Sequence, residues 1–223
     1  LHVAPVVGVL ALQGASNAHR STFAKLGIEA REVRNLNDLE GLTHLVLPGG
    51  ESTTIHHLLE LFDLRQPIIE RYRERRLALF GTCAGAILLG QGDGEPPPRF
   101  GLLDAVLERN AYGRQTESFS RGIRFESSDP EDHCAGLHRF GLHGSGMHGV
   151  FIRAPKVSSV GPAARVLAWD GTDPILLQGR GLLAATFHPE LTGDPRLHAY
   201  FLLPELWQAA EPAQREPLAA SRS

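Results

Sequence analysis

One cysteine stands where a nucleophile can work. The apolar residues 77–80 predict a buried strand, residues 81–85 a tight turn, and the small apolar residues after Cys83 a helix. A nucleophile at the apex of a strand–turn–helix is held at the edge of a sheet. Gly81 and Gly85 suit the turn because they have no Cβ. A helix beginning at Cys83 or Ala84 would point its positive end at the sulfur and favour the thiolate, whereas the alternative is a buried structural cysteine.

A base and an orienting carboxylate stand near the other end of the chain. The apolar residues 182–187 predict a strand that leads into His188, Pro189 and Glu190. Residues i and i+2 of an extended chain point to the same side, so His188 and Glu190 can project together. A cysteine nucleophile needs a base, and the base needs a group that orients it. The pattern therefore predicts a Cys83–His188–Glu190 triad, with a solvated loop as the alternative for the last two.

Strands and helices alternate through the first ninety residues, which favours a parallel, doubly wound sheet. The expected strands are residues 6–12, 28–33, 45–47 and 77–80, and the expected helices follow Ser16 or Asn17, begin at 51–54 and cover 66–76. Ligands collect at the carboxyl ends of the strands in such sheets. The loops at 13–14, 48–52 and 81–85 meet at that edge.

The second half has fewer helices and favours some antiparallel strands. Strands are expected at residues 106–110, 122–125, 150–153, 166–169, 175–178 and 182–187, and a final helix at 197–208. We expect a single domain over residues 1–208. The polar residues of 209–223 predict a disordered tail.

Composition narrows the function classes. The 223 residues are 42% hydrophobic and carry a formal net charge of −3, so no strongly basic surface points to nucleic acid. No apolar run approaches the roughly 18 residues that a membrane helix needs. Two cysteines in unlike contexts, and no secretory signal pattern, favour a cytoplasmic protein.

The cysteine turn, Gly49-Gly50 and the His188-Pro189-Glu190 motif together resemble the class I, triad-type glutamine amidotransferases. Within that class the chain is similar, over roughly residues 6–203, to the glutaminase subunits of pyridoxal 5′-phosphate synthase. The stretches that carry the resemblance are 12–14, 47–54, 80–85, 108–110, 113–115, 118–119, 151–155 and 187–191. It implies an α/β fold of the flavodoxin-like type, with three α/β/α layers and a mixed, mostly parallel central sheet.

The resemblance also implies the reaction. Such enzymes hydrolyse L-glutamine to L-glutamate and ammonia without a cofactor, and they pass the ammonia to a separate synthase subunit in a large hetero-oligomer. Carried over by motif, Cys83 is the nucleophile that forms the thioester, and His188 and Glu190 complete the triad. Gln13 is linked to activation by the synthase. The positions that match glutamine-binding residues are Gly50, Glu51, Ser52, Arg109, Ile152 and Arg153.

Elementary chemistry agrees with those positions. The backbone N–H groups of Gly50 and Ala84 are the candidates for the oxyanion hole. Arg109 or Arg153 can pair with the substrate α-carboxylate, and Glu51 can attract its α-ammonium.

Residues 126–149 form a longer segment than the resemblance leads us to expect. Its histidines and one cysteine recur about every five residues, at His133, Cys134, His138, His143 and His148. That spacing does not keep ligands on one helix face, and structural zinc sites use tighter pairs. We therefore expect an extended surface loop and no metal site.

Three other functions remain open from the sequence. The chain can serve as the glutaminase of another pathway, such as imidazole glycerol phosphate synthase, although residues 48–53 and 151–155 weigh against this. A noncatalytic scaffold would leave the triad coincidental. A cysteine peptidase would need a substrate groove of which the sequence gives no other sign.

Overall fold

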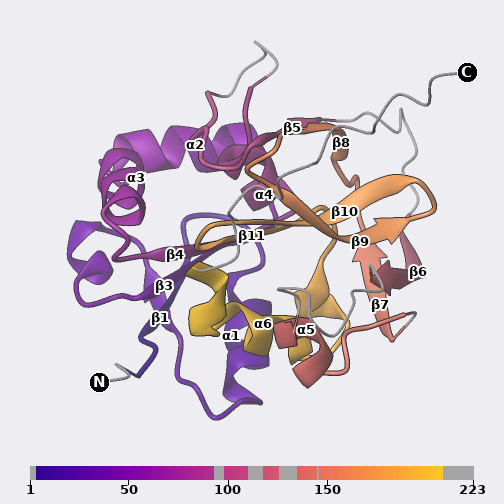
Figure 1. The fold of residues 1–223 in the computed structure, drawn as a ribbon. Helices are drawn as coiled ribbons and strands as arrows, with labels where there is room; N and C mark the ends of the chain where they lie inside the picture. Colours follow the sequence, from indigo (N-terminus) through magenta and orange to yellow (C-terminus); the bar gives the residue numbers. More distant parts are fainter. Residues whose placement is uncertain (1–3, 93–97, 110–117, 126–134, 145, 208–223) are drawn as a thin grey trace, which may run out of the picture.

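The structure, a computed structural model, describes residues 4–92, 98–109, 118–125, 135–144 and 146–207. Within these residues, nine strands form one sheet in the order β2-β1-β3-β4-β11-β10-β9-β6-β7 (Figure 1). They are β1 (Val7–Leu10), β2 (Arg31–Val33), β3 (His44–Leu47), β4 (Ala78–Thr82), β6 (Phe119–Phe125), β7 (Met147–Phe151), β9 (Arg165–Asp170), β10 (Asp173–Gly179) and β11 (Leu182–Ala185). A separate small sheet pairs β5 (Ala105–Glu108) with β8 (Lys156–Val160).

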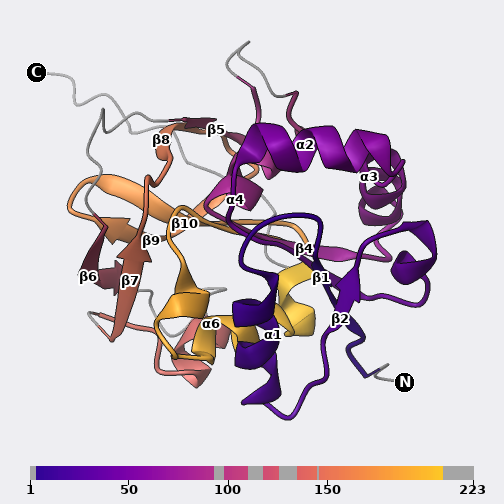
Figure 2. The ribbon, with the colours of Figure 1, turned by 180° about the vertical axis from the view of Figure 1, so that it is seen from behind.

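Helices cover both faces of the large sheet (Figures 1 and 2). One face carries α2 (Ser52–Leu61), α3 (Arg65–Arg73) and α4 (Ala84–Leu89). The other carries α1 (Ser16–Ala24), α5 (Ala135–Arg139) and α6 (Arg196–Phe201). Short 3-10 turns are η1 (Leu36–Leu39), η2 (Pro189–Leu191) and η3 (Pro204–Trp207). The expected three-layer α/β/α fold is confirmed.

The sheet changes direction between its halves. From β2 through β1, β3 and β4 to β11, every neighbouring pair is parallel. From β11 through β10, β9 and β6 to β7, every pair is antiparallel. The parallel half carries the apolar runs that the sequence shows, because its strands are buried on both faces.

Alternate residues of one strand enter different cores. On β4, Phe80 packs in the core that includes Phe23 of α1 and Phe201 of α6, whereas Leu79 packs with Leu59 of α2 and Ile68 of α3. All these residues are fully buried.

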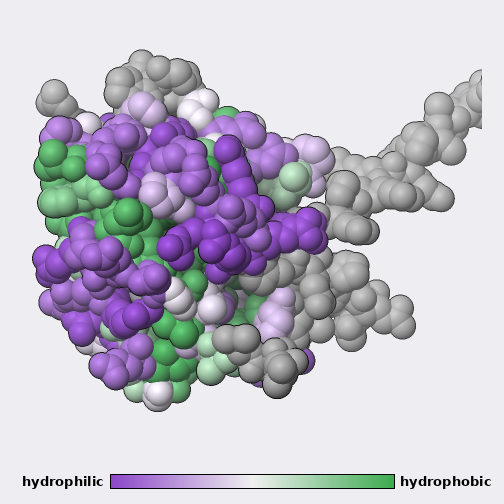
Figure 3. Space-filling model, turned by 90° about the vertical axis from the view of Figure 1, so that its left-hand side faces the viewer, coloured by the Kyte–Doolittle hydropathy of each residue, from purple (hydrophilic) through white to green (hydrophobic). Residues whose placement is uncertain are grey.

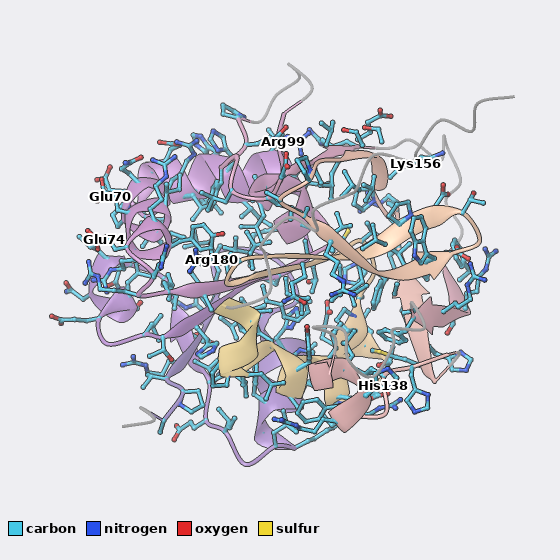
Figure 4. All side chains as sticks on the ribbon, viewed as in Figure 1. Glu70, Glu74, Arg99, His138, Lys156 and Arg180 are labelled. Atoms are coloured by element: carbon cyan, nitrogen blue, oxygen red, sulfur yellow. The ribbon has the colours of Figure 1, made fainter. Side chains whose placement is uncertain are left out.

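The outer surface is more polar than the cores. Figure 3 shows a face that is mostly hydrophilic with smaller hydrophobic areas, and Figure 4 shows Glu70 and Glu74 at the outside of the molecule.

Several sequence-based boundaries were wrong. Strand β8 was not predicted, since its Lys156-Val157-Ser158-Ser159-Val160 run buries only one side chain. Helix α1 has Ala15 at its N-cap, and neither Ser16 nor Asn17 caps it. The final helix, predicted over 197–208, ends at Phe201, and a separate 3-10 turn begins at Pro204, which has no N–H to continue a helix.

The prediction of one extended loop over residues 126–149 was also wrong in its described part. This part contains helix α5 and most of strand β7, which pairs with β6. The rings of His138 and His143 stack with their centroids 5.4 Å apart, whereas His133 and Cys134 lie outside the described residues. The described residues contain no group of three or more His, Cys, Asp or Glu side chains that could hold a metal. The predicted tail over 209–223 lies outside them as well.

Candidate active site

Cys83 occupies a strained backbone position between β4 and α4. Its φ and ψ are 48° and −104°, a conformation that side chains other than glycine rarely adopt. Its N–H donates to the carbonyl of Ala185 at 2.8 Å, and its carbonyl accepts from the N–H of Ile87 at 3.1 Å. The strained backbone is therefore that of the nucleophile itself, and the hydrogen bonds to Ala185 and Ile87 keep Cys83 in this conformation.

The two glycines beside Cys83 are required by close packing. A Cβ on Gly85 would lie 1.9 Å from the carbonyl oxygen of Leu47, and one on Gly81 would lie 2.6 Å from the backbone of Gly85. Neither glycine has a positive φ. Their role is thus to bring α4 against β3 and β4, which differs from the turn angles that the sequence argument assigned to them.

His188 and Glu190 contact each other as the sequence predicted, but by a different geometry. Nδ1 of His188 lies 2.8 Å from Oε1 of Glu190, and both side chains are buried. Strand β11 ends at Ala185, and His188 is the N-cap of the 3-10 turn η2, so the pair is not in extended backbone. The N–H of His188 donates to the carbonyl of Val150 at 2.8 Å, which fixes the base against β7.

The electrostatics of the pair favour an imidazolium beside a carboxylate. Burial alone would lower the pKa of His188, but hydrogen bonds with Cys83 and Glu190, and their charges, raise it to about 10. Burial disfavours the Glu190 carboxylate, yet the pKa of Glu190 is lowered because His19 and His188 lie against it. Cys83 Sγ lies 3.8 Å from the carbonyl oxygen of Ile152. The triad residues are therefore brought together with charges that suit a cysteine nucleophile.

The loop at residues 48–51 is held from three sides. The N–H of Gly49 donates to Thr82 Oγ1 at 3.1 Å, and its carbonyl accepts from the N–H of Ala15 at 3.2 Å. The Gln13 side-chain oxygen accepts from the N–H of Glu51 at 2.9 Å.

No room is left for a side chain at Gly49 or Gly50 of this loop. A Cβ on Gly49 would lie 2.3 Å from Cε1 of His188 and 3.4 Å from Cβ of Cys83, and one on Gly50 would lie 2.3 Å from Oε1 of Gln13. Within the described part of the chain, the N–H groups of Gly50 and Ala84 make no hydrogen bond, which leaves both free to donate to a ligand.

Glu51 is engaged in capping helix α2. Its carboxylate accepts from the N–H groups of Thr53 at 3.2 Å and Thr54 at 2.7 Å. Although burial acts to raise the pKa of Glu51, the hydrogen bonds from Thr54 and Thr53 lower it to about 2. Arg109 pairs with the same carboxylate at 2.9 Å and also donates to Thr53 Oγ1 at 2.9 Å. These contacts place Arg109 over the first turn of α2.

The remaining predicted binding residues surround the same loop edge. Ser52 is buried at the first position of α2. Ile152 contacts Cys83 through its carbonyl, and Arg153, which is exposed, has a φ of 45°. Cys83 and Arg153 are two of the four non-glycine residues with positive φ in the described part of the chain. Such strain gathers at functional sites.

The sequence argument missed three buried polar residues beneath the triad. His19 of α1, Thr82 of β4 and His198 of α6 are each buried, and His19 contacts the other two through side-chain nitrogen and oxygen atoms. One signal was available: His19 lies four residues before Phe23, on the apolar side of α1. A histidine at that spacing is a buried histidine, and a buried polar group needs a partner.

The profile of the SNO glutamine amidotransferase family matches residues 9–204. The chain belongs to this family. That confirms the resemblance to glutamine amidotransferases, and the match spans both halves of the sheet, from β1 to η3.

Named relatives agree. The chain is 50% identical over 199 residues to "Pyridoxal 5′-phosphate synthase subunit PdxT" of one strain of Thermus thermophilus, covering 88% of this chain and 96% of that relative. The protein of the same name from a second strain of this bacterium is 49% identical with the same coverage. A solved structure titled "Crystal structure of glutamine amidotransferase" superposes with a TM-score of 0.78 at 48% identity, covering 91% of this chain and 99% of that one. None of the helices in the described part of the chain has the length and apolar character needed to cross a bilayer.

Proposed function

We propose that this chain is the glutaminase subunit of a pyridoxal 5′-phosphate synthase, and that it hydrolyses L-glutamine to L-glutamate and ammonia through a thioester on Cys83. One observation carries the proposal: a strained cysteine between β4 and α4 lies beside a buried His188–Glu190 pair in a member of a glutamine amidotransferase family. The names of the relatives support the pathway. A scaffold would leave the triad without a reason, and membership of a glutamine amidotransferase family weighs against a peptidase.

The reaction begins with attack by the Cys83 thiolate on the carboxamide carbon of glutamine. Negative charge then develops on the amide oxygen. The N–H groups of Gly50 and Ala84, both unpaired within the described residues, donate to that oxygen. Losing one such donor typically costs about 3–4 kcal/mol of barrier, so the loop that holds Gly50 matters nearly as much as the triad.

His188 moves the protons. As an imidazolium it protonates the leaving nitrogen, which departs as ammonia and leaves an acyl thioester on Cys83. The neutral imidazole then takes a proton from water, whose oxygen attacks the thioester and releases glutamate. Glu190 holds Nδ1 of His188 at 2.8 Å throughout, which aims the other ring nitrogen at the reacting atoms.

The substrate amino-acid end lies across the N-terminus of α2 and the turn after β7. Among the described residues, Arg109, which Glu51 and Thr53 orient, and Arg153 are the cations that we assign to the α-carboxylate. Ser52 and the backbone of Gly50 and Ile152 complete the pocket. Glu51 is committed to capping α2, so its role toward the α-ammonium is secondary to holding Arg109.

The ammonia passes to a synthase subunit with which the chain forms a hetero-oligomer. The chain acts as a single domain over residues 1–208. We place it in the cytoplasm. Gln13 supports the link to the partner: its side chain fixes the N–H of Glu51 next to the oxyanion loop. Movement of the 13–15 segment on docking would be passed directly to Gly49 and Gly50. No cofactor is needed, because side chains and water supply every proton and bond.

The test is glutamate release from glutamine, with and without the synthase subunit, for wild type and Cys83→Ala. Wild type should release glutamate faster with the synthase, and Cys83→Ala should lose on the order of 10⁴-fold or more in kcat. Activity that persists in Cys83→Ala overturns the mechanism. Activity that the synthase leaves unchanged overturns the pathway and keeps the glutaminase. Cleavage of a peptide, or no glutamate from wild type, would favour the peptidase or the scaffold.

A further inference from the structure

A buried polar cluster extends from the triad into the core below it. It consists of His19, Thr82 and His198, which come from α1, β4 and α6, and all three are fully buried. Helices α1 and α6 lie side by side on one face of the sheet (Figure 2), so the cluster is closed off from solvent. The mechanism above uses none of these groups.

His19 joins the cluster to the triad carboxylate. Its Nε2 lies 3.4 Å from Oε2 of Glu190 and 3.1 Å from Oγ1 of Thr82, and its Nδ1 lies 2.9 Å from Nε2 of His198. Glu190 Oε1 is held by His188, whereas Oε2 is buried with no hydrogen bond of normal geometry within the described residues. Nε2 of His19 therefore lies within 3.4 Å of a buried, charged oxygen.

Proton counting selects one arrangement. The pKa values of His19 and His198 are both lowered by burial, so each ring is neutral at pH 7 and carries one N–H. If His198 donates from Nε2, then Nδ1 of His19 accepts and the His19 proton sits on Nε2, facing Glu190. In the reverse arrangement Nε2 of His19 accepts from the Thr82 hydroxyl and turns a lone pair toward Oε2 of Glu190, and an N–H is left on Nδ1 of His198, which has no partner within the described residues. The reverse arrangement has the higher free energy, because it buries an unpaired N–H on His198 and brings a lone pair of His19 against the carboxylate of Glu190.

We propose that His19 is a positioning residue of the glutaminase reaction: its Nε2–H, fixed by His198, lies between Oγ1 of Thr82 at 3.1 Å and the second oxygen of Glu190 at 3.4 Å, stabilises the charge on that oxygen, and is linked through Thr82 to the N–H of Gly49. The inference rests on the proposed function. It makes the base and the oxyanion loop parts of one network, because Thr82 Oγ1 contacts both His19 and Gly49 at 3.1 Å.

Few charges act on this network. The ionisable groups whose charges reach His19 are Glu190 and His188, and His19 is the one that reaches His198. The other neighbours are rings: Phe80 lies edge-on to His19 at 6.2 Å, and Phe23 edge-on to His198 at 5.0 Å. A change in pH dependence after substitution of His19 therefore reports on the triad.

The experiment compares His19→Leu with His19→Gln in the assembled complex with the synthase. Leucine removes the donor, whereas the glutamine amide can place an N–H near the position of Nε2. We expect His19→Leu to lower kcat roughly tenfold to a hundredfold, the range that loss of an outer supporting hydrogen bond costs in metal sites, with KM little changed. The alkaline limb of its pH–rate profile should move to lower pH, because a misplaced Glu190 stabilises the His188 imidazolium less. His19→Gln should recover most of both.

Two further readouts separate this proposal from the proposed function. Alkylation of Cys83 by iodoacetamide at neutral pH needs no glutamine, and it should be slower in His19→Leu than in wild type and His19→Gln. Proton–nitrogen correlation NMR of histidine-labelled wild type should find His19 protonated on Nε2. His44→Leu is the matched control: His44 lies on β3, packs edge-on against Phe201 of the same core and bonds to Thr43 rather than to the triad.

Three outcomes overturn the inference: a wild-type pH profile and alkylation rate in His19→Leu, a His19→Gln variant as impaired as His19→Leu while equally folded by thermal unfolding, or a His19 proton on Nδ1. If wild type releases no glutamate but the alkylation and NMR results hold, the proposed function fails and the positioning of the cysteine–histidine pair by His19 stands.

Discussion

The two halves of the sheet divide the work of the site. The parallel half, β2-β1-β3-β4-β11, ends in the loops that carry Cys83, Gly49-Gly50 and His188, of which Cys83, Gly49 and His188 are buried. The antiparallel half ends in β6 and β7, whose strands are partly exposed, and it supplies the turn with Ile152 and Arg153. The bond-making groups thus follow strands packed on both faces, whereas part of the proposed substrate-recognising set, Ile152 and Arg153, follows an edge strand. A catalytic geometry that must hold within a fraction of an ångström needs the more rigid support.

After Cys83→Ala, the largest effect should follow from breaking the parallel half at Glu190. Glu190→Gln keeps the shape but removes the charge that stabilises His188, and kcat should fall roughly 10³–10⁴-fold, as when the carboxylate of a serine triad becomes an amide. Glutamate release with the synthase measures this. The control is Glu32→Gln on β2, whose carboxylate pairs with Arg20 at the surface. Equal losses in the two variants would contradict a role for Glu190 in the triad.

The pH dependence of the same variant has a defined sign. The pKa of His188 is raised to about 10 in the folded chain from an ordinary value of 6.5. A raised pKa contributes stability that is fully present below pH 6.5 and is lost as the pH rises through 10. Wild type should therefore lose free energy of unfolding over this range, and Glu190→Gln should lose less, as measured by urea unfolding at several pH values. A steeper loss in the variant would refute the assignment.

A glycine pair tests packing in the two halves directly. Gly85→Ala forces a Cβ to within 1.9 Å of the Leu47 carbonyl in the parallel half, whereas Gly122→Ala on β6 meets nothing within 4 Å. We expect Gly85→Ala to cost about 3 kcal/mol of unfolding free energy or more, with loss of activity, since α4 must shift. Gly122→Ala should stay within about 0.5 kcal/mol. Urea unfolding of both variants checks this, and similar values would remove the contrast between the halves.

Arg109→Gln tests recognition apart from chemistry. Arg109 is aimed by Glu51 and Thr53, so its loss should raise KM for glutamine roughly tenfold or more while kcat changes little, because a hydrogen bond to a charged group contributes about 1.5–3 kcal/mol. Arg153→Gln, measured in the same way, decides which arginine meets the α-carboxylate. A fall in kcat at constant KM would place Arg109 with the reacting atoms instead.

The smallest effect belongs to the outer antiparallel half. Arg121 on β6 pairs with Asp170 on β9 at 2.8 Å, but its side chain is 59% exposed. Arg121→Ala should change the free energy of unfolding by less than about 1 kcal/mol, because solvent and salt screen such pairs. Unfolding at low and high salt measures it, and a larger, salt-independent loss would show that this half is more tightly coupled than its exposure suggests.

Local patterns were enough to predict the elements that hold the nucleophile and the base. The apolar strand, the glycines and Cys83 are contiguous, and His188 and Glu190 are two residues apart, so local spacing named the candidate triad and the family resemblance supplied its reaction. The extended-chain argument for that last pair named the right contact through the wrong geometry, because Pro189 begins a 3-10 turn. A short motif therefore predicts which side chains meet more reliably than it predicts the backbone conformation that brings them together.

What could not be predicted comes from contacts between distant parts of the chain. His19 and His198 are 179 residues apart and meet only because α1 and α6 pack on the same face of the sheet. Strand β8 was missed for a related reason: its pairing with β5 is long-range, and its own pattern of burial is weak. Likewise, the commitment of Glu51 to capping depends on where α2 begins.

The bond from the His188 N–H to Val150, together with the approach of Cys83 to Ile152, joins the triad to β7. Strand β7 is one of the two edge strands of the sheet, with a neighbour on one side only among the described strands. Regions with few buried contacts open locally before the whole molecule unfolds. We therefore expect this edge to fray first on warming, so that activity is lost at a temperature below the one at which the molecule unfolds.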